Sequence, residues 1–239
     1  MVAVHPHFGP VGATVVALLA AWFVVRIARS PVTVARRRAQ IEARPDGRTR
    51  FHRRYVLSWW LLTLVALVPL FTDPRLRPSD YGLQRPSFSG FAFALGAFAA
   101  MVGLLALRGR RVVSAPPRVA FLLPRNGRER AWGVATACTA GIGEEIVFRG
   151  AFLAFAVGVL HLPFIWAALA VSLFFGLGHL YQGWTGVTAT TLFGLCATVL
   201  YSFSGSLLLP ILVHTAVDLG PFVLMRYSQP ASVGSTIPG

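Results

Sequence analysis

Three of the eight acidic residues of this chain lie inside long apolar stretches, together with one arginine and two of the six histidines. These residues are Glu144, Glu145, Arg149, His179, His214 and Asp218. An ionisable side chain in the middle of a bilayer costs on the order of 3 kcal/mol on insertion scales. Such residues on three helices would be very hard to tolerate unless they faced one another. The sequence therefore predicts that their side chains converge in the interior of a helix bundle.

The stretch GIGEEIVFRG, residues 141–150, combines two glutamates with an arginine. Glu145 and Arg149 are four residues apart with the glutamate on the N-terminal side, which is the favourable order for an ion pair along a helix. We interpret this pair as structural, because it orients the helix and offsets one charge. Glu144 lies about 100° further round the same helix and has no local cation. It is therefore free to point at another helix.

Each of the two histidines also shares a helix face with a residue four positions away. In FFGLGHL, His179 shares a helix face with Phe175, and in HTAVDLG, His214 shares one with Asp218. The expected shared site comprises Glu144, His179, His214 and Asp218. Two histidines and a carboxylate are a common zinc ligand set that leaves a position for water, and zinc lowers the pKa of that water to about 7. A glutamate beside the water can act as a general base.

The net charge of the cluster does not decide whether a metal ion is bound. Three carboxylates against Arg149 give −3 + 1 = −2 when both histidines are neutral. One Zn²⁺ ion would balance this charge, and two protonated groups or histidinium would balance it equally well. The four candidate catalytic residues are thus also the candidate zinc ligands, and no other cofactor is expected.

Other interpretations of the same residues stay open. A histidine within a membrane is as often a hydrogen-bonding residue between helices as a ligand, and His214 with Asp218 can form a simple pair on one helix. Carboxylates with histidines are also typical of proton relays and transporters. The chain has no HExxH, G-x-S-x-G or P-loop motif, which disfavours a conventional zincin, an elbow-type serine hydrolase and an NTPase.

Composition predicts the elements that position these residues. Of the 239 residues, 55% are hydrophobic and 13% are charged, about half the charged fraction of roughly 25% in soluble domains. With a mean hydropathy of +0.65, this predicts an all-α fold, a polytopic transmembrane helix bundle. Cys138 and Cys196 make neither a disulfide framework nor a zinc knuckle, and we interpret both as buried hydrophobes.

Seven apolar segments are long enough to span a bilayer, which takes about 20 residues. They lie at about 10–29, 55–72, 88–107, 131–157, 162–180, 185–203 and 207–227. In the fourth, the glycines of GIG at residues 141–143 can break the helix, which would make eight spans. We expect this break, because an unbroken helix would place Glu144 on the order of 15 Å deeper than His179 at 1.5 Å per residue.

The basic residues predict the orientation. All 22 are arginine, and most fall in two blocks between apolar segments, residues 26–54 and 108–130. Cytoplasmic loops have this character under the positive-inside rule, so we attribute the net charge of +14 to topology and expect no nucleic acid. The sequence predicts a multi-pass protein of the cell membrane with its N-terminus outside and its C-terminus in the cytoplasm.

The same pattern divides the chain into three parts. Residues 1–130 are interpreted as N-terminal transmembrane helices with arginine-rich loops, and residues 131–227 as the transmembrane core that carries the chemistry. The remaining residues, 228–239, are small and polar and are predicted to be disordered.

Three motifs in this order resemble those of a known family. EEIVFR matches EExxxR, FGLGH matches FxxxH, and HTAVD matches HxxxN/D. Together they resemble the CAAX-protease and bacteriocin-processing family (CPBP) of intramembrane proteases, which includes the type II prenyl-protein endopeptidases and the bacterial Abi proteins. The resemblance covers roughly residues 130–220. It implies an all-helical bundle with a sunken active site, in which Glu145 and Arg149 would brace the helix.

The resemblance also implies roles for the other residues. Glu144 and His179 would activate the attacking water, while His214 and Asp218 would hold a metal or stabilise the oxyanion. Asp218 stands where many members have asparagine, and an ionised aspartate cannot donate a hydrogen bond to an oxyanion. This difference favours a metal-ligand role or a protonated Asp218.

The expected function is an intramembrane endopeptidase, with or without a metal, that acts on a membrane-associated or lipid-anchored protein or peptide near the cytoplasmic face. One alternative is a non-catalytic immunity or scaffold protein of the same family, which would have no need of Glu144. Another is a secondary transporter, in which interrupted helices commonly occur in both halves, whereas the polar residues here cluster in the C-terminal half. The expected partners are the substrate and the lipid bilayer, and the oligomeric state is left open.

Overall fold

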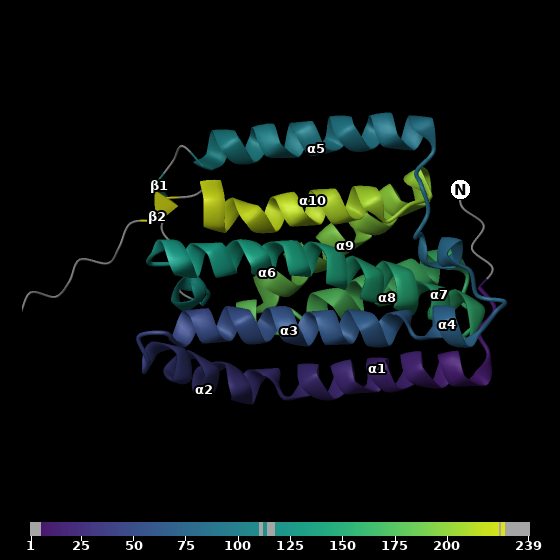
Figure 1. Cartoon of the computed structure of the whole chain (residues 1–239), viewed down its shortest axis with the longest axis horizontal. Helices are drawn as coiled ribbons and strands as arrows, with labels where there is room; N and C mark the ends of the chain where they lie inside the picture. The colour runs from purple at the N-terminus through teal and green to yellow at the C-terminus, as the bar shows by residue number, and fades with distance from the viewer. Residues whose placement is uncertain (1–5, 110–111, 114–117, 225, 228–239) are drawn as a thin grey trace, which may run out of the picture.

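The computed structural model describes residues 6–109, 112–113, 118–224 and 226–227, and this part of the chain is almost entirely helical, as predicted (Figure 1). The helices are α1 (Pro10–Ala28), α2 (Ser30–Glu42), α3 (Gly47–Leu67), α4 (Pro69–Thr72), α5 (Phe88–Gly109), α6 (Gly127–Glu145), α7 (Leu153–Gly158), α8 (Phe164–Leu177), α9 (Trp184–Ser204) and α10 (Leu208–Leu219). Two strands of two residues, β1 (Val112–Val113) and β2 (Arg226–Tyr227), pair in parallel. The tail predicted to be disordered, residues 228–239, lies outside the described residues.

Shorter helical segments complete the described part of the chain. Turns of 3₁₀ helix lie at Pro78–Tyr81, Ala120–Leu122 and Leu180–Gln182. Two segments are π-helical, Ile146–Phe152 and Gly220–Leu224. The first of these joins α6 directly to α7.

The long helices alternate in direction along the long axis of the molecule (Figure 1). In that view α1, α3, α6, α10 and α5 form a row, and each helix in the row contacts the next. Helices α8 and α9 pack against each other. Helix α2 and the first turns of α3 and α6 lie at the same end of the bundle, on the left of Figure 1, and we call this the arginine-rich end.

Several of the helices are suited to a lipid environment. Among the described residues, three helical stretches are long and apolar enough to cross a membrane: Pro10–Ala28, Gly47–Thr72 and Trp184–Ser204. The apolar helices Phe164–Leu177 and Leu208–Val223 are shorter. These apolar helices indicate that the protein is embedded in a membrane. The number of membrane spans, seven or eight, stays a prediction.

The break expected at the GIG glycines is wrong, because helix α6 continues through them to Glu145. The glycines instead allow close helix contact. A Cβ atom on Gly141 would overlap Thr215 of α10, and one on Gly143 would lie 2.7 Å from the hydroxyl oxygen of Thr63 of α3. Both neighbouring helices therefore approach α6 at the turn that carries the glutamates.

The expected mismatch in depth is resolved by the shortness of α8. This helix has 14 residues, or about 21 Å at 1.5 Å per residue, which is less than the roughly 30 Å of a bilayer core. The chain therefore turns before it reaches the end of the bundle. His179, two residues after the helix, is half-buried and lines the same cavity as Glu144.

A cluster of aromatic rings fixes the π-helical segment that follows the glutamates. The ring of Phe23 of α1 lies 5.5 Å from that of Phe148 and 5.7 Å from that of Phe152, measured between centroids. Phe174 of α8 lies 6.0 Å and 5.6 Å from the same two rings. Because every residue of the π-helical segment is buried, this packing also holds the preceding turn of α6 in place.

The substitution Gly141→Ala tests the close contact between α6 and α10. We expect it to lower the free energy of unfolding by about 1–3 kcal/mol, the usual cost of overpacking, because the methyl group overlaps Thr215. Gly127→Ala is the matched control, since a Cβ atom there has no neighbour within 4 Å. Unfolding in mixed detergent micelles measures both variants, and equal stabilities would contradict the packing role of Gly141.

Candidate active site

The last turn of α6 and the π-helical segment after it carry three charges into the bundle interior. Glu144, Glu145 and Arg149 are buried, with at most 4% of each residue exposed. Three other elements bring side chains to this region: His214 and Asp218 come from α10, Tyr55 comes from α3, and His179, from the turn after α8, lines the same cavity as Glu144. The six residues that the sequence predicts to converge therefore do lie in one region.

Glu145 is the centre of the buried network. Its Oε1 atom accepts a hydrogen bond from Nη1 of Arg149 at 2.9 Å, so the ion pair expected from the spacing is present. The same oxygen lies 2.7 Å from Nδ1 of His214. A carboxylate paired with an arginine has no proton to donate, so Nδ1 of His214 is the donor. The other ring nitrogen of His214 is thereby directed away from Glu145.

One carboxylate oxygen of Glu144 accepts a hydrogen bond, and the other has no partner among the described residues. The hydroxyl of Tyr55 donates a hydrogen bond to Oε1 of Glu144 at 2.7 Å. Its Oε2 atom is buried and has no hydrogen-bond partner among the described residues. This oxygen lies 3.9 Å from Nε2 of His214. Glu144 therefore offers a free carboxylate oxygen in a fixed position.

His214 faces two carboxylates with its free nitrogen. Its Nε2 atom lies 3.6 Å from Oδ2 of Asp218 and 3.9 Å from Oε2 of Glu144. A simple pair between His214 and Asp218 was one alternative that the sequence left open, whereas the short hydrogen bond of His214 goes to Glu145. The aromatic ring of Phe193 packs against the imidazole with centroids 5.0 Å apart. The imidazole is therefore fixed both by its hydrogen bond and by its ring contact.

His179 is oriented by the backbone of α8. Its Nδ1 atom donates to the carbonyl of Phe175 at 3.0 Å, which leaves Nε2 as the nitrogen able to accept a hydrogen bond. The rings of His179 and Phe175 lie 4.9 Å apart. In the described part of the chain, no carboxylate oxygen lies within 4.0 Å of His179.

A cavity of about 1070 Å³ brings most of these groups together. Glu144, His179 and Asp218 line it, as does Tyr55. His214 is not part of the lining and contacts Glu144 from behind the wall. The predicted residues thus divide into those that a ligand in the cavity would touch and those that hold them.

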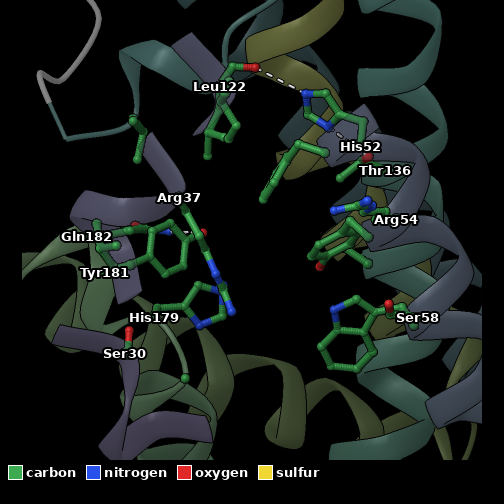
Figure 2. A pocket seen from close by; sticks show the side chains of 18 of the residues that line it. Ser30, Arg37, His52, Arg54, Ser58, Leu122, Thr136, His179, Tyr181 and Gln182 are labelled. Carbon is green, nitrogen blue, oxygen red and sulfur yellow. Dashed lines mark hydrogen bonds between the residues drawn. The ribbon is translucent and has the colours of Figure 1, made fainter. Parts of the chain in front are cut away.

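The N-terminal helices form much of the cavity wall, which the sequence did not predict. Figure 2 shows Arg37 and Tyr181 beside His179, with Arg54 and Ser58 across the cavity from them. The arginines that line the cavity are Arg26, Arg37, Arg44, Arg50 and Arg54. The sequence explains these arginines by topology alone and places the chemistry in the core at residues 131–227, whereas the structure puts them on the wall of the same cavity as Glu144.

No spacing within the sequence links Tyr55 to Glu144, because 89 residues separate them. The one local signal is that a tyrosine stands where an arginine block, residues 50–54, passes into an apolar run. Tyrosine is enriched at that level of a membrane protein for its amphipathic ring alone. The pattern therefore could not distinguish this residue from an ordinary interfacial tyrosine.

The fit of a metal ion is partial. The hydrogen bond from Nδ1 of His214 to a carboxylate is the arrangement that often orients a ligating histidine, and two further carboxylates face its Nε2. However, no group of three or more His, Cys, Asp and Glu side chains in the described ranges is arranged so as to hold a metal ion. The zinc-ligand roles of Glu144, His179, His214 and Asp218 therefore stay predictions.

Residues 127–220 match the model of a protein family described as "Type II CAAX prenyl endopeptidase Rce1-like". The match runs from the start of α6 to the end of α10 and includes all six of the predicted residues. No curated protein and no solved structure matched the chain.

The substitution Arg149→Met tests the buried network. We expect it to destabilise the protein by about 3–5 kcal/mol, because it leaves Glu145 as a buried charge without its arginine. The double variant Glu145→Gln, Arg149→Met removes both charges and should recover much of that loss. Unfolding in mixed detergent micelles measures each variant, and a double variant less stable than Arg149→Met would contradict this account.

Proposed function

Because residues 127–220 match the model of the type II CAAX prenyl endopeptidase Rce1-like family, we propose that this protein is an intramembrane endopeptidase that hydrolyses a peptide bond of a membrane-associated protein in the large cavity. The observation that carries the proposal is the free Oε2 atom of Glu144. This atom is buried, unpartnered among the described residues, and belongs to a residue that lines the cavity. A fixed carboxylate oxygen beside a space that can admit water and peptide is what a general base requires.

In the proposed reaction, Glu144 takes a proton from a water molecule as the water oxygen bonds to the carbonyl carbon of the substrate. Tyr55 occupies the other carboxylate oxygen, so the free one receives the proton. Nε2 of His179 accepts a hydrogen bond from the same water, because its Nδ1 is already committed to the backbone. Both groups orient the water as well as activate it.

The attack leaves a negative charge on the former carbonyl oxygen. In its imidazolium form, His214 favours this oxyanion by its positive charge from behind the cavity wall, where Glu145 holds the ring through Nδ1. Protonated Glu144 then passes its proton to the amide nitrogen as the carbon–nitrogen bond breaks. The products are a carboxyl group and an amine. Asp218, 3.6 Å from Nε2 of His214, favours the charged imidazole.

The proposed cellular setting follows from the arginine-rich end. The cavity extends from Glu144 to Arg44 and Arg50 at that end. Under the positive-inside rule this end faces the cytoplasm, with the N-terminus outside and the C-terminus inside. Substrates would therefore enter from the cytoplasmic side, either as membrane-associated proteins or as lipid-anchored ones.

Removing the general base tests the reaction. We expect Glu144→Gln to lower the cleavage rate by about 10²–10⁴-fold, because an amide cannot take the proton of water. Wild type and variant are expressed in the same host membrane, and new N-termini of membrane proteins are compared by mass spectrometry. Glu42→Gln is the matched control, since Glu42 is exposed on α2 and forms a surface ion pair with Arg38.

The outcomes separate the alternatives. The same new N-termini in wild type and in Glu144→Gln would contradict the protease and favour the scaffold or the transporter. A chelator added to purified, active protein tests the metal separately. Loss of activity that Zn²⁺ restores would assign a metalloprotease, and retained activity would remove only the metal.

Tyr55 is proposed as a positioning residue for Glu144. Because a hydrogen bond to a charged group contributes about 1.5–3 kcal/mol, Tyr55→Phe should lower kcat roughly 10–100-fold with little change in KM. Tyr81→Phe is the control, since its buried hydroxyl has no partner in the described part of the structure. Steady-state kinetics on a peptide found in the preceding experiment measures both, and an unchanged kcat in Tyr55→Phe would refute this role.

A further inference from the structure

A second cavity, of about 330 Å³, lies at the arginine-rich end and does not contain the candidate catalytic residues. Its lining residues are Asp46, Thr49, Arg50, Arg53, Arg54 and Arg128. All but one come from the first turns of α3 or the residue before it, and Arg128 comes from the first turn of α6. The cavity therefore sits where two adjacent helices begin.

The lining of this cavity is strongly basic. Four arginines and one aspartate give +4 − 1 = +3, and Asp46 is already engaged in an ion pair with Arg50. Within the described ranges, no carboxylate lies within 4.0 Å of Arg53, Arg54 or Arg128. Three guanidinium groups around one small cavity match the charge and the hydrogen-bonding geometry of a phosphate group.

An apolar surface continues from the basic cavity along α3. Leu57, Leu61 and Leu64 are each more than 60% exposed, and Trp60 is 42% exposed. Arg53, Leu57 and Leu61 are spaced four residues apart, so they lie on one face of the helix. A molecule on this face would meet guanidinium groups at the helix start and apolar side chains over the next two to three turns.

We propose that this surface binds an anionic phospholipid, with its phosphate headgroup in the basic cavity and its acyl chains along the Leu57–Leu64 face of α3. An anionic lipid fits better than a zwitterionic one, because a zwitterionic headgroup brings its own cation to a lining that already has a charge of +3. Basic pockets between membrane helices at the cytoplasmic side are suited to such headgroups.

The bound lipid would adjoin the candidate active site. Arg50 and Arg54 line both cavities, and Figure 2 shows Arg54 on the wall across from His179. The headgroup would thus contact arginines that also border the space proposed for the substrate. The binding itself does not depend on the proposed cleavage reaction.

Native mass spectrometry of the full chain in detergent tests the proposal with phosphatidylglycerol and phosphatidylcholine as probes. We expect wild type to retain phosphatidylglycerol in preference to phosphatidylcholine. The variant Arg53→Gln, Arg128→Gln removes two charges that border only the small cavity, and its affinity for phosphatidylglycerol should fall about thirtyfold. The variant Arg29→Gln, Arg36→Gln is the matched control, since it removes two exposed arginines that line neither cavity.

A third variant separates a lipid from a free anion. Leu57→Asn, Leu61→Asn should weaken phosphatidylglycerol binding and leave competition by inorganic phosphate unchanged, because it alters only the chain-binding face. Circular dichroism and thermal unfolding confirm that each variant is folded. An equal loss in the control variant would overturn the proposal, as would equal retention of phosphatidylcholine. Phosphatidylglycerol binding that is insensitive to the leucine substitutions would show a free-anion site instead.

Discussion

The rest of the site depends on a single buried carboxylate oxygen, Oε1 of Glu145, which accepts hydrogen bonds from both Arg149 and His214. A buried charge is tolerated only when it is paired and hydrogen-bonded. Because Glu145 meets this requirement, the adjacent Glu144 need not bind the arginine. The two neighbouring glutamates thus have different tasks. Glu145 is paired with Arg149 and orients the imidazole of His214, whereas Glu144 keeps one oxygen without a hydrogen-bond partner among the described residues.

This network requires helices to approach closely around one turn of α6. Gly141 and Gly143 provide the room, since α10 and α3 contact the backbone there. The π-helical segment that follows is held through Phe148 by the rings of Phe23 and Phe174. Packing on three sides therefore determines where the charges lie, and the charges in turn determine which nitrogen of each histidine is available.

The sequence predicted what local spacing can reveal. The i, i+4 relation gave the Glu145–Arg149 pair, and the cost of isolated charges in lipid gave the convergence of the polar residues. Contacts between distant segments left no such signal. The bond from His214 to Glu145 rather than to Asp218, and the bond from Tyr55 to Glu144, depend on packing between helices. The helix break expected at Gly141 was wrong because a glycine can serve close contact as well as flexibility.

The family match begins at residue 127, yet Tyr55 and the arginine-lined wall of the cavity belong to α1, α2 and α3 and the turns between them. The large cavity is therefore formed by two parts of the chain. The C-terminal part carries Glu144, His179 and Asp218, and the N-terminal part forms the arginine-lined wall that faces them. An exchange of the N-terminal helices between related chains that keeps a tyrosine at position 55 would then alter which ligands the cavity admits while leaving Glu144 held as it is here. The residues that select a ligand could then change in sequence separately from the residues that act on it.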